Sequence, residues 1–252
     1  MKTVAFSSIK GGTGKSSLAI LCANYCAAAS ARVLVIDLDI QNSASFYYLE
    51  DFDTIDKKNI ALALHTGKIE ENIVKSKRTN VDILPSHFAL VNLRAISDRT
   101  LRKLLAAKPL PYDFVFIDCA PTYDNIVLNA VNCADLILTP VKFSQFDFKG
   151  CVFYRDQLGH DSDKLPAWRL FFNFYVASRS DSPDSTTHQY ESIFRDTFAK
   201  TIVPVTVPKA ALIQEAIDKG SLITQAKDKV KLFEAIKGLS EYIGVKGKVG
   251  SF

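Results

Sequence analysis

A glycine-rich segment near the start of the chain, Lys10–Ser16 (KGGTGKS), restricts the fold more than any other feature of the sequence. The apolar run Thr3–Ser7 precedes it and is typical of a buried strand. The Ala-rich stretch Ser16–Ala29 follows it and has the length of a helix. A short loop that joins a buried strand to a helix opens a βαβ unit. The segment therefore predicts an α/β domain with this strand inside a parallel sheet.

Apolar runs of strand length alternate with helical stretches along the rest of the chain. Runs without polar interruption are typical of strands covered by helices on both faces. We expect further strands at Val33–Asp37, Val81–Leu84, Phe114–Asp118, Leu136–Pro140, Leu170–Tyr175 and Ile202–Val205, and further helices at Val91–Ala106 and Tyr190–Ala199. The polar segment Ser178–Thr187 is expected to be a surface loop. The predicted fold is a single α/β domain, residues 1–246, with a mostly parallel, doubly wound twisted sheet flanked by helices on both faces, and a short flexible tail at 247–252.

Composition excludes several other classes of protein. The chain has 252 residues, of which 48% are hydrophobic and 23% charged, a balance typical of globular proteins. No apolar run approaches the roughly 20 residues that span a bilayer, so no transmembrane segment is expected. A strand begins within three residues of the start, which leaves no room for a signal peptide. The five cysteines lack C-x-x-C spacing and are expected to be reduced thiols. These features predict a cytoplasmic protein.

The spacing within Lys10–Ser16 matches the P-loop, a glycine-rich turn that ends in Gly-Lys-Ser. Glycines let consecutive backbone N–H groups point at phosphate oxygens, and the positive end of the following helix favours the same anion. Lys15 is expected to neutralise the β- and γ-phosphates, and the Ser16 hydroxyl to ligate Mg²⁺. The predicted ligand is MgATP, bound by the loop residues Lys10, Gly11, Gly12, Thr13, Gly14, Lys15, Ser16 and Ser17.

Aspartates stand at the ends of two predicted strands. Asp37 and Asp39 end the second strand, and Asp118 ends the apolar run Phe114–Ile117. Ligands bind at the carboxyl ends of parallel strands, so we expect these acids beside the loop. Asp118 has the form of a Walker-B acid, which holds Mg²⁺ through its water shell. We expect Asp37 and Asp39 to differ in role. A helix cap is the competing interpretation for each acid.

These motifs together resemble the deviant Walker-A ATPases, and among them the ParA/Soj family of DNA-partitioning ATPases in the wider ParA/MinD superfamily. Lys10 opens the loop, DLDIQ occupies 37–41, and Asp118 is followed by Cys-Ala-Pro. The resemblance continues through LTPV at 138–141, Asn173 and VPK at 207–209, and it covers about residues 2–244. Ile40 and Ala120 replace prolines that are usual in the family, which alters loop stiffness without removing a chemical group.

The resemblance implies roles for individual residues. Lys10 matches the family lysine that reaches across a two-fold interface to the phosphates of the other subunit. Asp39 matches the acid that positions the attacking water, and Asp37 belongs to the polar shell of the magnesium. Asn173 matches an adenine contact, and Pro208 lies in the segment that lines the base. The implied catalytic residues are thus Lys10, Lys15 and Asp39, and the implied metal residues are Ser16, Asp37 and Asp118.

The family dimer binds DNA without sequence preference through basic residues outside the nucleotide site. Arg179 matches one such position, which follows the strand with Asn173. A second family position falls on Ala211, which cannot serve, and Lys209 is the nearest cation. Because backbone binding needs several positive charges, the net charge of +4 permits this role without establishing it.

The resemblance therefore implies an ATPase that forms an ATP-bound homodimer, binds DNA and hydrolyses ATP when a ParB-like or other activator protein stimulates it. Such a protein segregates or positions a plasmid, a chromosome or other cargo, and would be nucleoid-associated. A second possibility is a MinD-like membrane-associated ATPase, for which Val230, Phe233, Ile236 and Ile243 on one stripe of the last helix would provide the anchor. A third is a P-loop metallocentre-maturation or biosynthetic enzyme, and a fourth is a scaffold that binds ATP without turnover.

Overall fold

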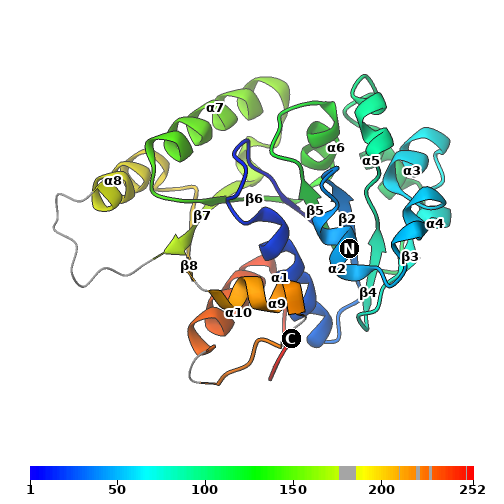
Figure 1. Cartoon of the computed structure of the whole chain (residues 1–252). Helices are drawn as coiled ribbons and strands as arrows, with labels where there is room; N and C mark the ends of the chain where they lie inside the picture. The colour runs from blue at the N-terminus through cyan, green and yellow to red at the C-terminus, as the bar shows by residue number, and fades with distance from the viewer. Residues whose placement is uncertain (176–185, 210, 220–221, 227–228, 248) are drawn as a thin grey trace.

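The computed structural model describes residues 1–175, 186–209, 211–219, 222–226, 229–247 and 249–252, and within these ranges eight strands form one sheet (Figure 1). The strand order is β3-β4-β2-β5-β1-β6-β7-β8. All neighbouring strands are parallel except β3 and β4. The strands are β1 (Lys2–Phe6), β2 (Val33–Leu38), β3 (Val74–Lys75), β4 (Val81–Leu84), β5 (Phe114–Cys119), β6 (Leu136–Val141), β7 (Trp168–Tyr175) and β8 (Ile202–Pro208).

Helices cover both faces of this sheet, with α1, α9 and α10 on one side and α5, α6 and α7 on the other (Figure 1). The helices are α1 (Lys15–Ala28), α2 (Ser43–Tyr48), α3 (Ile60–Thr66), α4 (Ile69–Asn72), α5 (Thr100–Ala107), α6 (Asn125–Cys133), α7 (Gln145–Asp161), α8 (Thr186–Phe198), α9 (Ala211–Lys219) and α10 (Val230–Ile243). Short 3-10 turns η1 (Phe52–Asp56), η2 (Phe88–Leu93) and η3 (Leu165–Ala167) connect some of them. The predicted doubly wound α/β fold is confirmed.

Alternate residues of the central strands supply two separate hydrophobic cores. In β1, Val4 and Phe6 face the core beneath α1 and α10, whereas Ala5 faces the core beneath α5, α6 and α7. In β2, Val35 and Ile36 divide in the same way. Both faces of a strand are therefore apolar, which is why the sequence runs were continuous. The sheet edge at the carboxyl ends of the strands remains for polar residues.

The predicted helix Val91–Ala106 was wrong in its first half. Residues 88–93 form the 3-10 turn η2, and α5 begins only at Thr100. Around Ser97, side chains bond the backbone locally, since the Ser97 Oγ accepts from the Arg99 N–H and the Thr100 hydroxyl donates to the Ser97 carbonyl. Such bonds compete with helical ones, so apolar spacing alone extended the helix too far. The two-residue strand β3 was also not predicted.

The carboxyl-terminal residues pack against the domain, which differs from the expected flexible tail. Phe252 is 7% exposed and its ring lies 5.3 Å from that of Tyr25 and 5.7 Å from that of Phe233. Its backbone exchanges hydrogen bonds of 2.8 and 3.1 Å with Ile223. Aromatic burial of this kind stabilises a terminus. Phe252 is therefore packed against the domain, although the predicted domain boundary lies at residue 246.

Candidate functional site

The strands β1, β2 and β5 bring the predicted site residues to one edge of the sheet. Phe6, the last residue of β1, pairs with Asp118 of β5, and Asp118 also pairs with Asp37 of β2. The glycine-rich loop leaves β1 at this point and enters α1 at Lys15. The two acids and the loop thus meet at the carboxyl ends of parallel strands, as predicted.

Two glycines of the loop adopt backbone conformations that other residues rarely take. Gly12 has φ +68° and Gly14 has φ +97°. A Cβ at Gly14 would lie 2.4 Å from the Nδ2 atom of Asn173, which is closer than van der Waals contact allows. The Asn173 Nδ2 donates instead to the Thr13 carbonyl at 2.7 Å. Glycine at position 14 therefore permits both the turn and the approach of β7 to the loop.

Lys15 lies inside the loop and is 6% exposed. Its ammonium donates to the Ser8 hydroxyl at 3.2 Å and to the Lys10 carbonyl at 3.1 Å. Burial lowers the pKa of Lys15, while the carboxylates of Asp118 and Asp39 oppose that shift. A buried cation with only neutral oxygen partners is suited to an incoming polyphosphate.

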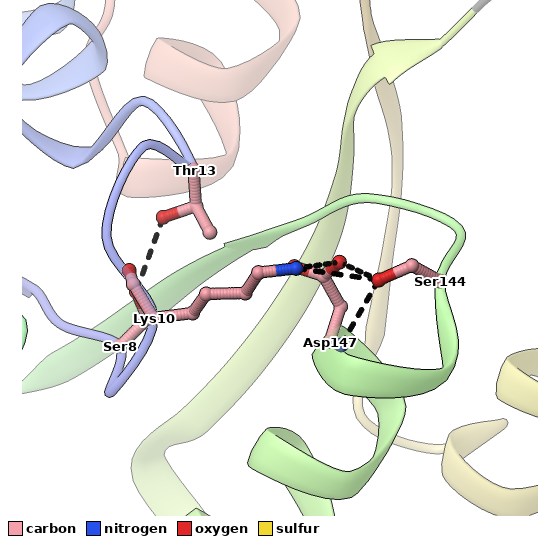
Figure 2. Close-up of polar contacts among 5 residues, drawn as sticks. All are labelled: Ser8, Lys10, Thr13, Ser144 and Asp147. Atoms are coloured by element: carbon pink, nitrogen blue, oxygen red, sulfur yellow. Dashed lines mark hydrogen bonds and ion pairs between the residues drawn. The ribbon is translucent and has the colours of Figure 1, made fainter.

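Lys10 points the other way, as Figure 2 shows. Its ammonium lies 2.7 Å from the Asp147 Oδ2 and 3.3 Å from the Ser144 Oγ, at the amino end of α7. The Ser144 hydroxyl also donates to Asp147, and its oxygen accepts from the Asp147 N–H. The Lys10 side chain is 39% exposed, and that of Asp147 is 2% exposed. Lys10 is therefore held by its own chain, away from Thr13 and the turn that it opens.

Asp118 is completely buried and fits a role in holding a cation. Neither of its oxygens makes a well-formed hydrogen bond with the described residues. Burial raises its pKa well above the ordinary value and Asp37 adds to the shift, whereas the Ser16 side chain and the charge of Lys15 favour the ionised form. An orphaned carboxylate beside a hydroxyl is the kind of oxygen donor set that Mg²⁺ prefers.

Asp37 and Asp39 differ in their surroundings, because Asp37 lies within β2 whereas Asp39 follows its last residue, Leu38. Asp37 is buried and accepts hydrogen bonds from the Ser45 N–H, the Ser45 hydroxyl and the Asp39 N–H. Burial raises the pKa of Asp37 to about 6 against the effect of these bonds. Asp39 is 8% exposed, and its Oδ1 accepts from the Gln41 N–H at 3.0 Å. Asp37 thus fastens α2 to the sheet edge, whereas Asp39 reaches the cavity.

A cavity of about 710 Å³ lies over the loop. It is lined by Gly11, Gly12, Gly14, Lys15, Ser16, Ser17, Ile20, Asp39, Gln41, Ser43, Phe46, Tyr47, Pro121, Gln214, Ile217 and Asp218. The cavity joins the predicted phosphate loop and the predicted water-positioning acid. Asn173 and Pro208 are not among these lining residues. The Asn173 side chain donates to the Thr13 carbonyl and accepts from the Phe174 N–H.

The predicted DNA-binding residues lie far from the phosphate loop in the sequence, after the ends of β7 and β8. Arg179 lies outside the described residues. Lys209 is exposed, directly after β8, and its N–H donates to the Tyr175 carbonyl at 3.1 Å. Tyr175 is the last residue of β7 and precedes Arg179 by four positions. Lys209 therefore lies beside the end of the strand that leads to Arg179 in the sequence.

The sequence reasoning missed the partners of Lys10 and Asp37. The pattern Ser-x-x-Asp at 144–147 signals a capped helix, and Ser144 does cap α7. That signal identifies a helix start, but it does not reveal a contact with a lysine 137 positions away. No sequence pattern indicated that Ser45 would bind Asp37.

Comparisons with known proteins identify the family and the fold. A family profile described as "AAA domain" matches residues 1–158. The chromosome partitioning protein ParA of Myxococcus xanthus is 27% identical over 231 residues, which cover 88% of this chain and 80% of that protein. The chromosome-partitioning ATPase Soj of Treponema pallidum is 28% identical over 220 residues, which cover 81% of this chain and 83% of that protein.

Two solved structures show the same fold. A plasmid partition protein of Borrelia burgdorferi bound to AMPPNP is 24% identical with a TM-score of 0.75, over 96% of this chain and 99% of that one. Cobyrinic acid a,c-diamide synthase of Mycobacterium smegmatis, with bound ADP and magnesium, is 18% identical with a TM-score of 0.72, over 100% of this chain and 99% of that one.

Proposed function

Because the chain belongs to the AAA domain family and, within it, to the ATPases of the ParA/MinD type, we propose that it is a partitioning ATPase. In this proposal two copies close over two ATP molecules, and the closed dimer binds DNA without sequence preference. A ParB-like or other activator then stimulates hydrolysis, so that a plasmid, a chromosome or another cargo is segregated or positioned. The whole described chain acts as one ATPase domain.

The observation that carries this proposal is the contrast between the two loop lysines. Lys15 lies in the cavity, whereas the Lys10 ammonium rests on Asp147, away from the turn around Thr13 (Figure 2). A phosphate loop needs one buried lysine, so Lys10 is available for a second copy. A cation supplied in trans stabilises charge that develops in phosphoryl transfer.

Within one copy, we propose a separate role for each group of residues. The backbone N–H groups of Gly11–Ser16 and the Lys15 ammonium bind the phosphates. Ser16 and Asp118 hold Mg²⁺, with Asp37 behind them, and the ion supplies a counter-charge to the phosphates when bound. Asp39 faces the cavity and orients the attacking water. Asn173 and Pro208 are proposed on the side of the base.

A DNA surface is favoured over a membrane surface as the second partner. Phe233, Ile236 and Ile243 are 0% exposed in the core beneath α10, so the apolar stripe of that helix packs on the sheet. No helix among the described residues has the length and apolar character to cross a membrane. The exposed Lys209 is bonded to Tyr175, four positions before Arg179, and the two copies of a dimer would add their charges there.

The test is the affinity for plasmid DNA as a function of salt, with ATP, ADP and no nucleotide. The wild-type protein should bind strongly only with ATP, and Arg179→Glu should weaken binding and flatten its salt dependence. Lys103→Glu, an exposed reversal on α5 near the other sheet edge, is the matched control and should have little effect. Both variants should still dimerise with ATP by light scattering. Absence of ATP-dependent DNA affinity in the wild type at low salt would refute the DNA part of the proposal.

A further inference from the structure

Helix α7 contacts both ends of the segment Ser7–Lys10, through which the chain enters the phosphate loop. The Asp147 carboxylate lies 2.7 Å from the Lys10 ammonium, and the Tyr154 hydroxyl donates to the Ser7 Oγ at 2.7 Å. Asp147 and Tyr154 are seven residues apart in α7, which is about two helical turns, so they share one face of the helix. That face therefore holds the entry to the loop at two points.

The two contacts differ in how easily they can break. The Lys10 side chain is 39% exposed and is proposed to leave Asp147 for a second copy. Ser7 and Tyr154 are 0% and 1% exposed, so water does not reach the bond between them. Loss of a buried hydrogen bond is destabilising because no water replaces the missing partner. The bond of Tyr154 to Ser7 is therefore the lasting contact of α7 with this segment.

The backbone of Ser7 is held separately by β6. Its N–H donates to the Leu138 carbonyl at 3.0 Å, and its carbonyl accepts from the Thr139 hydroxyl at 2.6 Å. The Trp168 Nε1 donates to the same hydroxyl at 2.9 Å. Ser7 thus has backbone partners in β6 and a side-chain partner in α7, and Tyr154 is the residue that joins the helix to it.

Ser7 is adjacent to groups on both sides of the proposed phosphate and magnesium site. The next residue, Ser8, accepts from the Lys15 ammonium at 3.2 Å. Burial raises the pKa of the Cys119 thiol, and a hydrogen bond with the Ser7 side chain opposes that shift. Cys119 directly follows Asp118. A displacement of Ser7 would therefore affect both the loop and the end of β5.

We propose that Tyr154 is a positioning residue for ATP hydrolysis, whose hydroxyl holds Ser7 in place. When Lys10 moves to a second copy, this bond keeps the phosphate-binding groups where they are. Tyr154 acts through Ser7, since it is not among the residues that line the nucleotide cavity. The inference rests on the ATPase function proposed above.

The test removes the Tyr154 hydroxyl and measures turnover and nucleotide binding separately. Tyr154→Phe keeps the ring that lies 5.8 Å from Trp168 and 5.7 Å from Tyr123. Phosphate release at saturating MgATP should show kcat lowered about tenfold, the size of one buried hydrogen bond. MgADP affinity by calorimetry should change less than about twofold, because the transition state tolerates small displacements less than ground-state binding does.

Tyr48→Phe is the matched control. Tyr48 is 0% exposed, and its hydroxyl donates to the Asn24 side chain at 3.0 Å in the core on the other face of the sheet. Its loss should lower stability by an amount similar to that of Tyr154→Phe and leave kcat unchanged. Ser7→Ala removes the same bond from its other end, so it should lower kcat as Tyr154→Phe does, and the double variant should lose no more than either single variant.

Three results would overturn the positioning role while the ATPase site stands. They are wild-type kcat in Tyr154→Phe, an equal loss of kcat in Tyr48→Phe, and a double variant in which the two single losses multiply. If Tyr154→Phe does not fold, wild-type kcat in Ser7→Ala would overturn it in the same way. Failure of the wild type to bind MgADP or to release phosphate from MgATP would instead overturn the ATPase proposal.

Discussion

The phosphate loop and the amino end of α7 each hold one lysine of the KGGTGK segment, in opposite surroundings. Lys15 is buried among neutral oxygens from Ser8 and the Lys10 carbonyl. Lys10 is 39% exposed at its side chain and paired with the carboxylate of Asp147. The first region is built to receive an anion, and the second already contains one. Two identical side chains five residues apart thus have different tasks.

The different surroundings of Lys15 and Lys10 indicate which part of the chemistry a single copy of the chain can perform. The inner region already has its cation inside the loop, where Lys15 is 6% exposed and bonded to Ser8 and the Lys10 carbonyl. In the outer region an ion pair must break before Lys10 can reach another molecule. The Lys10 side chain is 39% exposed, so we expect that a second copy with bound ATP can compete for its ammonium.

Lys15→Ala should have the largest effect. Removal of the buried cation should lower MgATP affinity by at least about a hundredfold and abolish turnover, because charge-assisted bonds to the phosphates are lost. Calorimetry measures the affinity, and Lys10→Ala provides the matched control with affinity close to that of the wild type. Unchanged MgATP affinity in Lys15→Ala would remove the distinction between the two regions.

Lys10→Ala should affect turnover rather than binding. If Lys10 acts in trans as an arginine finger does, its loss should lower the hydrolysis rate by about a thousandfold. Phosphate release at saturating MgATP measures the rate. Mixing the variant with an excess of Asp39→Ala protein, which is expected to bind ATP and still has Lys10, should restore part of the activity in mixed dimers. A variant with wild-type turnover would show that the outer lysine has no catalytic part.

Asp147→Asn should release Lys10 from α7 and make dimers form more easily. We expect the ATP-dependent dimer at about two- to fivefold lower protein concentration, the range that corresponds to a partly exposed ion pair. Light scattering over a dilution series measures this. Glu191→Gln breaks the Arg195–Glu191 pair within α8 and should leave dimerisation unchanged. Weaker dimerisation in Asp147→Asn would mean that Asp147 supports Lys10 in the dimer instead.

The two buried acids of the inner region should make the stability of the protein depend on pH. Burial raises the pKa of Asp37 to about 6 and that of Asp118 well above its ordinary value. The folded protein therefore holds protons that the unfolded chain has released, so this contribution is greatest below about pH 4 and is lost as pH rises through about 6. The free energy of unfolding without nucleotide should fall by up to about 3 kcal/mol over this range.

Urea unfolding at several pH values measures this loss. Asp118→Asn removes one of the two buried acids, so the decline with rising pH should be smaller in the variant than in the wild type. Other acids titrate in both proteins and cancel in the difference. Identical pH profiles would show that Asp118 is not buried with a raised pKa.

The parts of the site that were predicted share one property: each is a short motif at a strand end. Lys15, Asp37 and Asp118 follow apolar runs, and parallel strands bring their carboxyl ends together whatever the loops between them do. The position of Asn173 beside the loop followed from the resemblance, and the structure adds that its amide donates to the Thr13 carbonyl. Its contact with the base stays a prediction. The sequence predicted where each motif lies, but it did not predict which side chains contact one another.

The missed features are contacts between segments that the sequence separates. Asp147 meets Lys10 across 137 positions, and Phe252 fills a gap between α1 and α10. Neither contact leaves a periodic signal, since each depends on the packing of several elements. The helix predicted from Val91 failed for a local reason, the bonds of Ser97 to its neighbouring backbone.

The sequence by itself determined the α/β class, the phosphate loop and the acids at the sheet edge, because apolar periodicity and the glycine–lysine spacing are local properties of the chain. Only the tertiary structure decided where Lys10 points, that Asp37 binds Ser45, and that Phe46 stands in the wall of the cavity. These depend on which side chains meet after the helices pack on the sheet. The function of a charged or aromatic side chain depends on the groups around it, and those groups come together only when the chain folds.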